Sequence, residues 1–145
     1  MKVRTMKLST RARYGTRALL EIALRGEDTP VLLKDIAARQ NISLAYLEQL
    51  MAPLVAGGLV TSTKGPKGGI SLAKRPENIH LDEVTRLLEG TTGLVECVAN
   101  PGLCEHSGDC VTHDVWCGLK EVMDGYLRSK TLQDLVDSEA GRKVA

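Results

Sequence analysis

The chain has 145 residues, enough for one domain with an extension but too few for two ordinary domains. Its start, MKVRTMKLST, is basic and polar, and no apolar stretch approaches the ~20 residues of a membrane span. These features argue against membrane contact, and we expect a cytoplasmic protein whose thiols stay reduced.

The net charge of +1 hides an asymmetry, because residues 1–75 carry 13 Lys and Arg against 5 Asp and Glu, whereas residues 76–145 carry 6 against 13. A basic half joined to an acidic half is typical of a nucleic-acid reader with a separate sensing or pairing element, although small domains often have uneven surfaces.

The first predicted helix is capped by Ser9 or Thr10 and runs to about Leu24, where Gly26 ends it. Its predicted buried stripe consists of Leu19, Leu20, Ala23 and Leu24. A second, short helix over 33–40 leads through Asn41 and Ile42 to a third helix that begins at Ser43. Two helices joined by so short a turn predict a helix-turn-helix.

The third helix has one predicted core face and one predicted exposed face. Apolar residues at helical spacing are expected to face the core: Leu44, Leu47, Leu50, Met51, Leu54 and Val55. Ala45, Tyr46, Glu48 and Gln49 are left facing outward. Gln can bond adenine and Glu can accept from the cytosine amino group, so these residues suit base reading, although a merely solvated face has a similar composition.

A β-hairpin is predicted after Gly57 and Gly58. The alternating run over 59–63 suits a strand, a basic turn spans 64–69, and a short strand follows over 70–73. Lys64 and Lys67 in this turn are expected to contact the DNA backbone or minor groove. The alternative, a phosphate-cradling loop, does not fit because the spacing differs from G-x-x-x-x-G-K-[ST] and the turn leads into a strand.

The acidic half is predicted to contain a helix over 80–90, a loop over 91–109 and a long helix that starts at Val111. The loop prediction follows from its glycines, its proline and its lack of apolar periodicity. The long helix carries a narrow apolar stripe, namely Val111, Val115, Leu119, Val122 and Tyr126. Such a stripe on a protruding helix favours pairing with a second copy of the chain. Ser129 or Thr131 is expected to cap a last short helix.

Four cysteines and one histidine are clustered with the spacing C-x6-C-x5-C-x2-H-x3-C, comprising Cys97, Cys104, Cys110, His113 and Cys117. In a reduced compartment, such a cluster indicates metal ligands or redox groups rather than disulfides. Zinc would accept three thiolates and one imidazole, whereas the wide spacing favours an iron–sulfur cluster. Cys117 is a substitute ligand, a redox spare or a small buried hydrophobe. Outside the cluster there is no nucleophile–base pair, so we do not expect an enzyme.

The chain resembles the IscR and NsrR group of winged-helix regulators over nearly its whole length. The segments that carry the resemblance are MKLSTRARYGTRALLEIAL, ISLAYLEQLMAPLVAGGLV, TKGPKGGISLA and the loop ending CVTHDVW. The resemblance implies a homodimer that reads double-stranded DNA at a palindromic or pseudo-palindromic site. It also implies an iron–sulfur cluster, expected as [2Fe–2S], in the loop before the dimer helix.

Within this group the chain is more similar to the IscR branch, which implies the ligand set Cys97, Cys104, Cys110 and His113. NsrR-type proteins use an aspartate near the N-terminus, where this chain has Arg13. The same comparison implies the DNA-binding residues Ser43, Tyr46, Glu48 and Gln49 in the recognition helix, and Lys64, Gly65, Pro66 and Lys67 in the wing. It also links the position of Glu48 to discrimination between two classes of operator.

The sequence therefore predicts a mainly α protein with a small β-hairpin wing (α+β), a winged helix-turn-helix domain plus a long dimerisation helix. The expected units are a DNA-binding domain over 1–90, a cluster-binding loop over 91–110, and a dimerisation helix with a C-terminal helix over 111–145. The expected function is transcriptional regulation, mainly repression, of cluster-assembly genes in response to iron–sulfur status. The alternatives are a nitric oxide or redox sensor of the same architecture and a zinc-stabilised DNA-binding protein.

Overall fold

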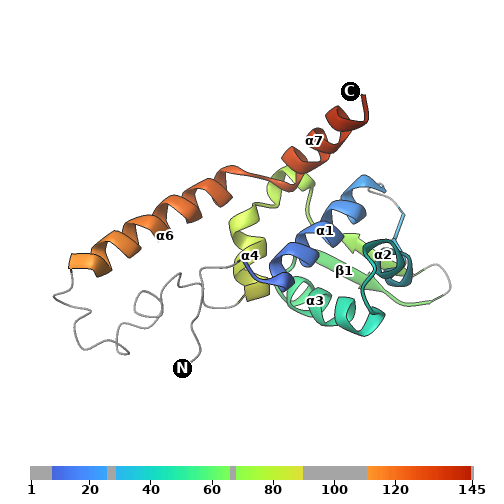
Figure 1. The fold of residues 1–145 in the computed structure, drawn as a ribbon. Coiled ribbons are helices and arrows are strands. Elements are labelled where there is room, and N and C mark those ends of the chain that lie inside the picture. Colours follow the sequence, from blue (N-terminus) through green and yellow to red (C-terminus); the bar gives the residue numbers. More distant parts are fainter. Residues whose placement is uncertain (1–7, 26–28, 66–67, 90–110, 145) are drawn as a thin grey trace.

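The computed structural model describes residues 8–25, 29–65, 68–89 and 111–144 (Figure 1). Its elements in chain order are α1 Thr10–Leu24, α2 Leu33–Gln40, α3 Leu44–Ala56, β1 Val60–Thr63, β2 Gly69–Leu72, the 3-10 helix η1 Pro76–Asn78, α4 Leu81–Glu89, α6 Val111–Ser129 and α7 Leu132–Val144. The predicted fold class, mainly helical with a two-stranded hairpin, is confirmed. The predicted loop over 91–109 lies outside the described residues.

Side-chain caps explain where α1 and α3 begin. The Ser9 hydroxyl accepts a hydrogen bond from the Ala12 N–H at 3.2 Å, and the Ser43 hydroxyl accepts one from the Tyr46 N–H at 3.1 Å. Each bond satisfies a donor that the first helical turn leaves free. Between α2 and α3, Asn41 adopts a left-handed conformation with φ 55°, which Asn tolerates better than most residues. The predicted helix-turn-helix therefore forms at the predicted residues.

The hairpin wing is tied to the start of α2. β1 and β2 pair antiparallel with Val60 opposite Leu72 and Thr63 opposite Gly69. Val31 and Ile70 exchange both backbone hydrogen bonds at 2.8 Å, which adds a bridge to the outer side of the hairpin. In the turn, a Cβ on Gly68 would lie 2.1 Å from the Thr63 carbonyl oxygen, so this position excludes a side chain.

A single core joins α1, α3, α4, the hairpin and the start of α7. Its largest fully buried side chains are Leu19, Ile22, Ile36, Leu47, Leu50, Leu54, Leu59, Ile70, Ile79, Leu132, Val60 and Val84. Leu132 is fully buried, which places α7 on the helix-turn-helix unit although it follows α6 in the chain (Figure 1). The predicted division at residue 111 separates residues that share this core.

Three leucine and valine residues predicted to face the core are exposed. Leu24 is 40% exposed, Leu44 43% and Val55 40%. Leu24 and Leu44 lie at helix ends, where the packing partners stop, and Val55 lies about 100° around the helix from the buried Leu54. On α1 the buried face consists instead of Ala12, Gly15, Ala18, Leu19 and Ile22.

The junction between α6 and α7 is fixed to the start of α4. The Leu81 N–H donates to the Lys130 carbonyl, and the Leu132 N–H donates to the Ile79 carbonyl, both at 2.9 Å. His80 Nδ1 lies 2.8 Å from the Arg128 carbonyl oxygen. From this junction α6 extends away from the other helices (Figure 1).

The last helix begins at Leu132 and is capped by Thr131, whose hydroxyl accepts from the Asp134 N–H. It has 13 residues, so the prediction of a short helix was wrong in length. No helix within the described residues is long and apolar enough to cross a bilayer.

Candidate DNA-binding surface and metal-ligand helix

The exposed face of α3 presents polar side chains at the start of the helix. Ala45, Glu48 and Gln49 are exposed, as the sequence predicts, while Leu47 and Leu50 anchor the opposite face in the core. A helix held in this way can enter a major groove with its first two turns, where Glu and Gln reach base edges. Whether Glu48 and Gln49 read bases stays a prediction.

Tyr46 is half-buried rather than fully outward-facing, because its ring packs on α1. The ring of Tyr14 meets it edge-on, with 6.3 Å between the ring centroids and an interplanar angle of 85°. The Arg17 guanidinium lies 5.9 Å from the Tyr14 centroid, within the range of a cation–π contact. Sequence reasoning missed Tyr14, because no local pattern indicates which residue on another helix its ring will contact.

Polar contacts also hold the helix-turn-helix against α1. The Glu21 carboxylate accepts from Gln40 Nε2 at 2.6 Å and pairs with Arg39 Nη1 at 3.4 Å. Both partners lie in the last turn of α2, so the contact fixes the direction in which the chain enters the turn before α3.

The wing presents Lys64 and Gly65 to solvent. Gly65 has φ +108°, a conformation that favours glycine, and its carbonyl accepts from the Gly68 N–H at 2.9 Å. The other two predicted wing residues, Pro66 and Lys67, lie outside the described residues. An exposed lysine at a hairpin tip is suited to a phosphate contact.

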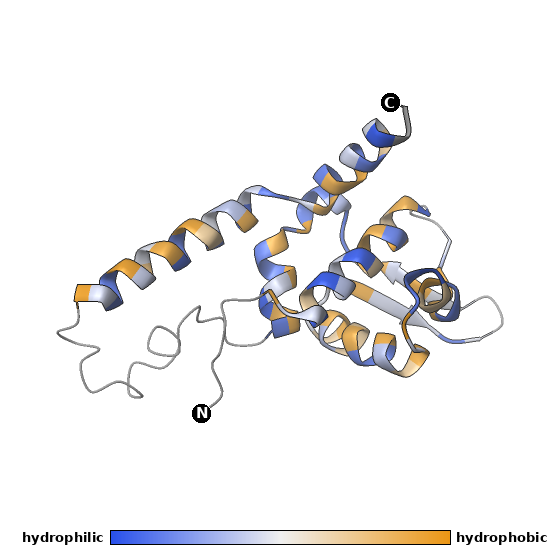
Figure 2. Ribbon diagram, viewed as in Figure 1, coloured by the Kyte–Doolittle hydropathy of each residue, from blue (hydrophilic) through white to orange (hydrophobic). Residues whose placement is uncertain are grey.

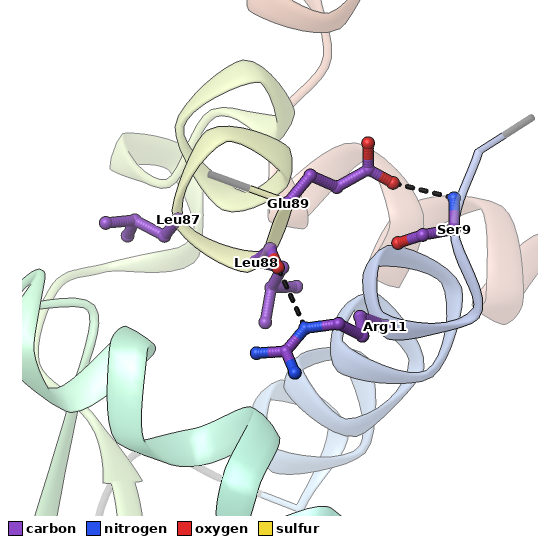
Figure 3. A pocket seen from close by; sticks show the side chains of 5 residues that line it. All are labelled: Ser9, Arg11, Leu87, Leu88 and Glu89. Carbon is purple, nitrogen blue, oxygen red and sulfur yellow. Dashed lines mark hydrogen bonds between the residues drawn. The ribbon is translucent and has the colours of Figure 1, made fainter. Parts of the chain in front are cut away.

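The last turn of α4 packs closely on both α1 and the end of α3 (Figure 3). The Glu89 carboxylate accepts the Ser9 backbone N–H at 2.7 Å, and Arg11 Nε donates to the Leu88 carbonyl at 3.0 Å. Arg11 is therefore engaged within the molecule, which the sequence did not indicate.

Two glycines allow this close approach of α4. A Cβ on Gly15 would lie 2.4 Å from Leu88 Cδ1, and a Cβ on Gly57 would lie 2.5 Å from Leu87 Cδ1. The first contact joins α4 to α1 and the second joins it to the C-cap of α3. The segment 90–110 with the predicted cysteine ligands follows this turn directly in the sequence.

His113 is the one member of the predicted ligand set that the structure describes. Cys97, Cys104 and Cys110 lie outside the described residues, and among those described no three potential ligands form a metal site. His113 lies in the first turn of α6, and its Nε2 is 3.4 Å from Cys117 Sγ one turn later. His113 Nδ1 is buried, and nothing in the described part of the chain hydrogen-bonds it.

This nitrogen fits a metal ligand, because a buried polar atom without a partner is unfavourable unless another group uses its lone pair. The lone pair of an imidazole nitrogen can bind either zinc or an iron–sulfur cluster. The fit concerns His113 alone among the four predicted ligands.

The two faces of α6 differ in character. The predicted stripe is exposed: Val111 is 79%, Val115 59%, Val122 69% and Tyr126 63% exposed, and Leu119 is half-buried. Figure 2 shows apolar residues recurring along this helix. At 100° per residue, His113 and Cys117 lie on the side opposite the stripe. The predicted pairing stripe and the predicted ligand His113 therefore lie on opposite sides of one helix.

Comparison with known proteins identifies the family. The model of the Rrf2 family, described as iron-dependent transcriptional regulators, matches residues 8–138. Protein rrf2 of Nitratidesulfovibrio vulgaris is 44% identical over 131 residues, covering 90% of this chain and 87% of that protein. The HTH-type transcriptional regulator IscR of Klebsiella pneumoniae is 40% identical over 134 residues, covering 92% and 82%.

Solved structures give the same assignment. T. potens IscR matches with a TM-score of 0.75 at 36% identity, covering 92% of this chain and 88% of that one. CymR, the global cysteine regulator of B. subtilis, matches with a TM-score of 0.70 at 36% identity, covering 91% and 97%. The relatives named by function are regulators rather than enzymes. The resemblance to the IscR group is confirmed, and the chain belongs to the Rrf2 family of transcriptional regulators.

Proposed function

We propose that this chain is a homodimeric regulator, mainly a repressor, that senses iron–sulfur supply and controls genes for cluster assembly. It binds a palindromic or pseudo-palindromic operator in double-stranded DNA. An iron–sulfur cluster, expected as [2Fe–2S], is held by Cys97, Cys104, Cys110 and His113. The observation that carries the sensing half of this proposal is the buried Nδ1 of His113, which has no hydrogen-bond partner among the described residues and follows the cysteine-rich segment in the sequence.

DNA reading is assigned to α3 and the wing. Ser43 caps the helix, Tyr46 is held in place by Tyr14, and Glu48 and Gln49 remain exposed for base edges. Lys64 and Gly65, followed by Pro66 and Lys67, supply the backbone contacts that set the register.

Glu48→Ala tests whether Glu48 discriminates between operators. We expect the rank order of affinities for different operators to change, because one side-chain contact to a base is worth about 1–3 kcal/mol of discrimination. Affinities are measured by fluorescence anisotropy with and without the cluster. An unchanged rank order in both states contradicts the assignment, and Glu77→Ala, exposed on η1 away from α3, is the matched control.

Dimerisation is assigned to the exposed stripe of α6. Large apolar side chains on one face of a helix are stabilised when a second helix covers them. We propose three units as the sequence suggested, 1–90 for DNA, 91–110 for the cluster and 111–145 for pairing, with the start of α7 sharing the core of the first.

When bound, the cluster would act as the sensing centre, because its occupancy would depend on the availability of iron and sulfide. His113 would supply an imidazole ligand from the first turn of α6, and the three cysteines would supply thiolates. We expect a conformational change in the 90–110 segment to be transmitted through the last turn of α4. This turn contacts α1 through Leu88 and Glu89, and the end of α3 through Leu87. A small shift of α3 is sufficient to change the affinity for DNA, because the two recognition helices of a dimer must meet half-sites about 34 Å apart. We expect a coupling of about 1–3 kcal/mol.

The first test is an anaerobic preparation whose visible spectrum is recorded with its iron, sulfide and zinc content per monomer. Brown protein with iron and sulfide in equal amounts, both lost in Cys104→Ala, supports the proposal. Colourless protein with one zinc per monomer overturns the sensing half and leaves a zinc-stabilised DNA-binding protein.

A regulator that senses nitric oxide or redox state is the second candidate. Its support is the half-buried thiol of Cys117, together with the similarity to CymR, a global cysteine regulator, because that similarity indicates that regulators of this fold differ in function. The two candidates are separated by titrating loaded protein with nitric oxide or peroxide while following DNA binding. Loss of binding at stoichiometric amounts favours the second candidate, and a response to iron and sulfide supply alone favours the first.

A further inference from the structure

Cys117 is the fourth cysteine of the chain and the one that the proposed ligand set does not use. It lies one helical turn after His113 on the same face of α6, half-buried, with its Sγ 3.4 Å from His113 Nε2. This distance is within hydrogen-bonding range for sulfur, so the thiol and the imidazole are partners.

Only one nitrogen of a neutral imidazole carries a proton, and the hydrogen bond made by one nitrogen decides whether the other can bind a metal. His113 Nε2 faces the sulfur of Cys117, whereas Nδ1 is buried without a partner among the described residues. If the thiol donated to Nε2, the proton would sit on Nδ1 and form a buried donor without an acceptor, which is unfavourable by about 1–3 kcal/mol. If Nε2–H donates to the sulfur, the buried Nδ1 keeps its lone pair, which a bound metal would satisfy.

We propose that Cys117 is a positioning residue that accepts the Nε2–H of His113 and so presents Nδ1 as the metal-binding nitrogen. The inference rests on the proposed ligand role of His113 and goes beyond it by naming the nitrogen and the residue that selects it. Partners of this kind fix both the tautomer and the orientation of a ligand histidine. Cys117 therefore acts through His113 and does not itself bind the metal.

The tautomer can be measured in metal-free protein by long-range ¹H–¹⁵N NMR on ¹⁵N-histidine-labelled chain, at about pH 8 where an ordinary imidazole is neutral. We expect His113 to carry its proton on Nε2, with a proton resonance protected from solvent exchange. His80 is an internal reference of the opposite kind, because its Nδ1 must donate to the Arg128 carbonyl. Resonances are assigned with His113→Gln and His80→Gln.

Two substitutions then separate positioning from simple packing. In Cys117→Ala the Nε2–H should exchange at least about fivefold faster, the factor for a hydrogen bond worth about 1 kcal/mol. Cys117→Ser retains an acceptor and should restore most of the protection. A proton on Nδ1 of His113 in the unsubstituted protein, or an exchange rate unchanged by Cys117→Ala, overturns the inference.

Pulsed EPR on reduced, reconstituted protein with histidine labelled only at Nδ1 completes the test. Strong ¹⁵N coupling from Nδ1, absent in His113→Gln, is expected, and coupling from Nε2 instead overturns the inference. Absence of histidine coupling from either nitrogen overturns the proposed ligand role, while the tautomer measurement still decides whether Cys117 holds the ring.

Discussion

The helix-turn-helix unit buries a contiguous set of large apolar side chains, whereas α6 has no buried residue and exposes Val111, Val115, Val122, Met123 and Tyr126. In the first region the apolar side chains pack against one another, because helices from both ends of the chain, including the start of α7, contribute to one core. The second is a helix of 19 residues attached at its C-terminal end by backbone bonds to η1 and α4. The difference supports the proposal that the shared core stabilises the fold and that α6 pairs two copies of the chain.

The largest effect should come from charging the exposed region. In the double variant Val115→Glu with Val122→Glu, we expect a monomer, because four carboxylates would meet across the proposed pairing face. Affinity for a two-half-site operator should fall by about 10²- to 10⁴-fold, the usual gain from linking two binding events. Sedimentation velocity and anisotropy measure the two quantities.

Glu121→Gln is the matched control for this variant, since Glu121 is exposed on α6 but outside the stripe. It should remain dimeric with nearly unchanged affinity. A double variant that is still dimeric would break the comparison, because α6 would then not be the pairing surface.

The next effect concerns the buried region. Leu132→Ala should lower the free energy of unfolding by about 2–5 kcal/mol, since it leaves a cavity at a fully buried site. Leu44→Ala, at an exposed leucine, should change it by about 0.5 kcal/mol or less. Urea unfolding followed by circular dichroism, at one protein concentration, compares them. Equal effects would mean that α7 does not belong to the core.

Much of the buried region was predictable because its signals are local. The caps at Ser9 and Ser43 and the limits of α2 depend on a few neighbouring residues. The exposure of Leu44 and Val55 was not predictable, because periodicity identifies an apolar face but not where the packing partner ends. The burial of Leu132 depends on α7 returning to α1 and η1, a contact between distant parts of the sequence.

In the candidate site, too, contacts within one helix were predictable from the sequence, whereas contacts between helices were not. His113 and Cys117 are four residues apart, a spacing that places two side chains on one face of a helix, and the structure brings them together on α6. The partners Tyr14 for Tyr46 and Leu88 for Arg11 join helices that no spacing rule relates. Family resemblance supplied the ligand and DNA-binding residues, which contacts alone do not assign.

A smaller effect should link the two regions. Arg11→Ala removes the bond to the Leu88 carbonyl and should reduce the difference in DNA affinity between cluster-loaded and cluster-free protein by about 0.5–2 kcal/mol. Arg13→Ala is the control, because Arg13 is exposed in the same turn and its side chain makes no hydrogen bond to the described residues. Titration of operator DNA in both states measures the difference. An Arg11 variant that weakens both states equally would assign Arg11 to DNA contact rather than to coupling.

The smallest effect, on thermal stability, is expected at the N-terminal cap of α7, where the chain returns to the core after α6. The Thr131 backbone N–H, donated to the Asp134 carboxylate at 2.9 Å, lowers the pKa of Asp134 below its usual value. A carboxyl whose pKa is lower in the folded state contributes stability above its unfolded pKa and loses that contribution as the pH falls through the folded pKa. Asp134→Asn should therefore lower Tm at neutral pH, and its difference from the unsubstituted chain should shrink when thermal unfolding is repeated at a pH below the lowered pKa of Asp134. Gln133→Ala removes an exposed contact to Asp137 on the same helix and should show no such pH dependence. A constant Tm difference for Asp134→Asn across this range would assign its effect to packing instead of charge.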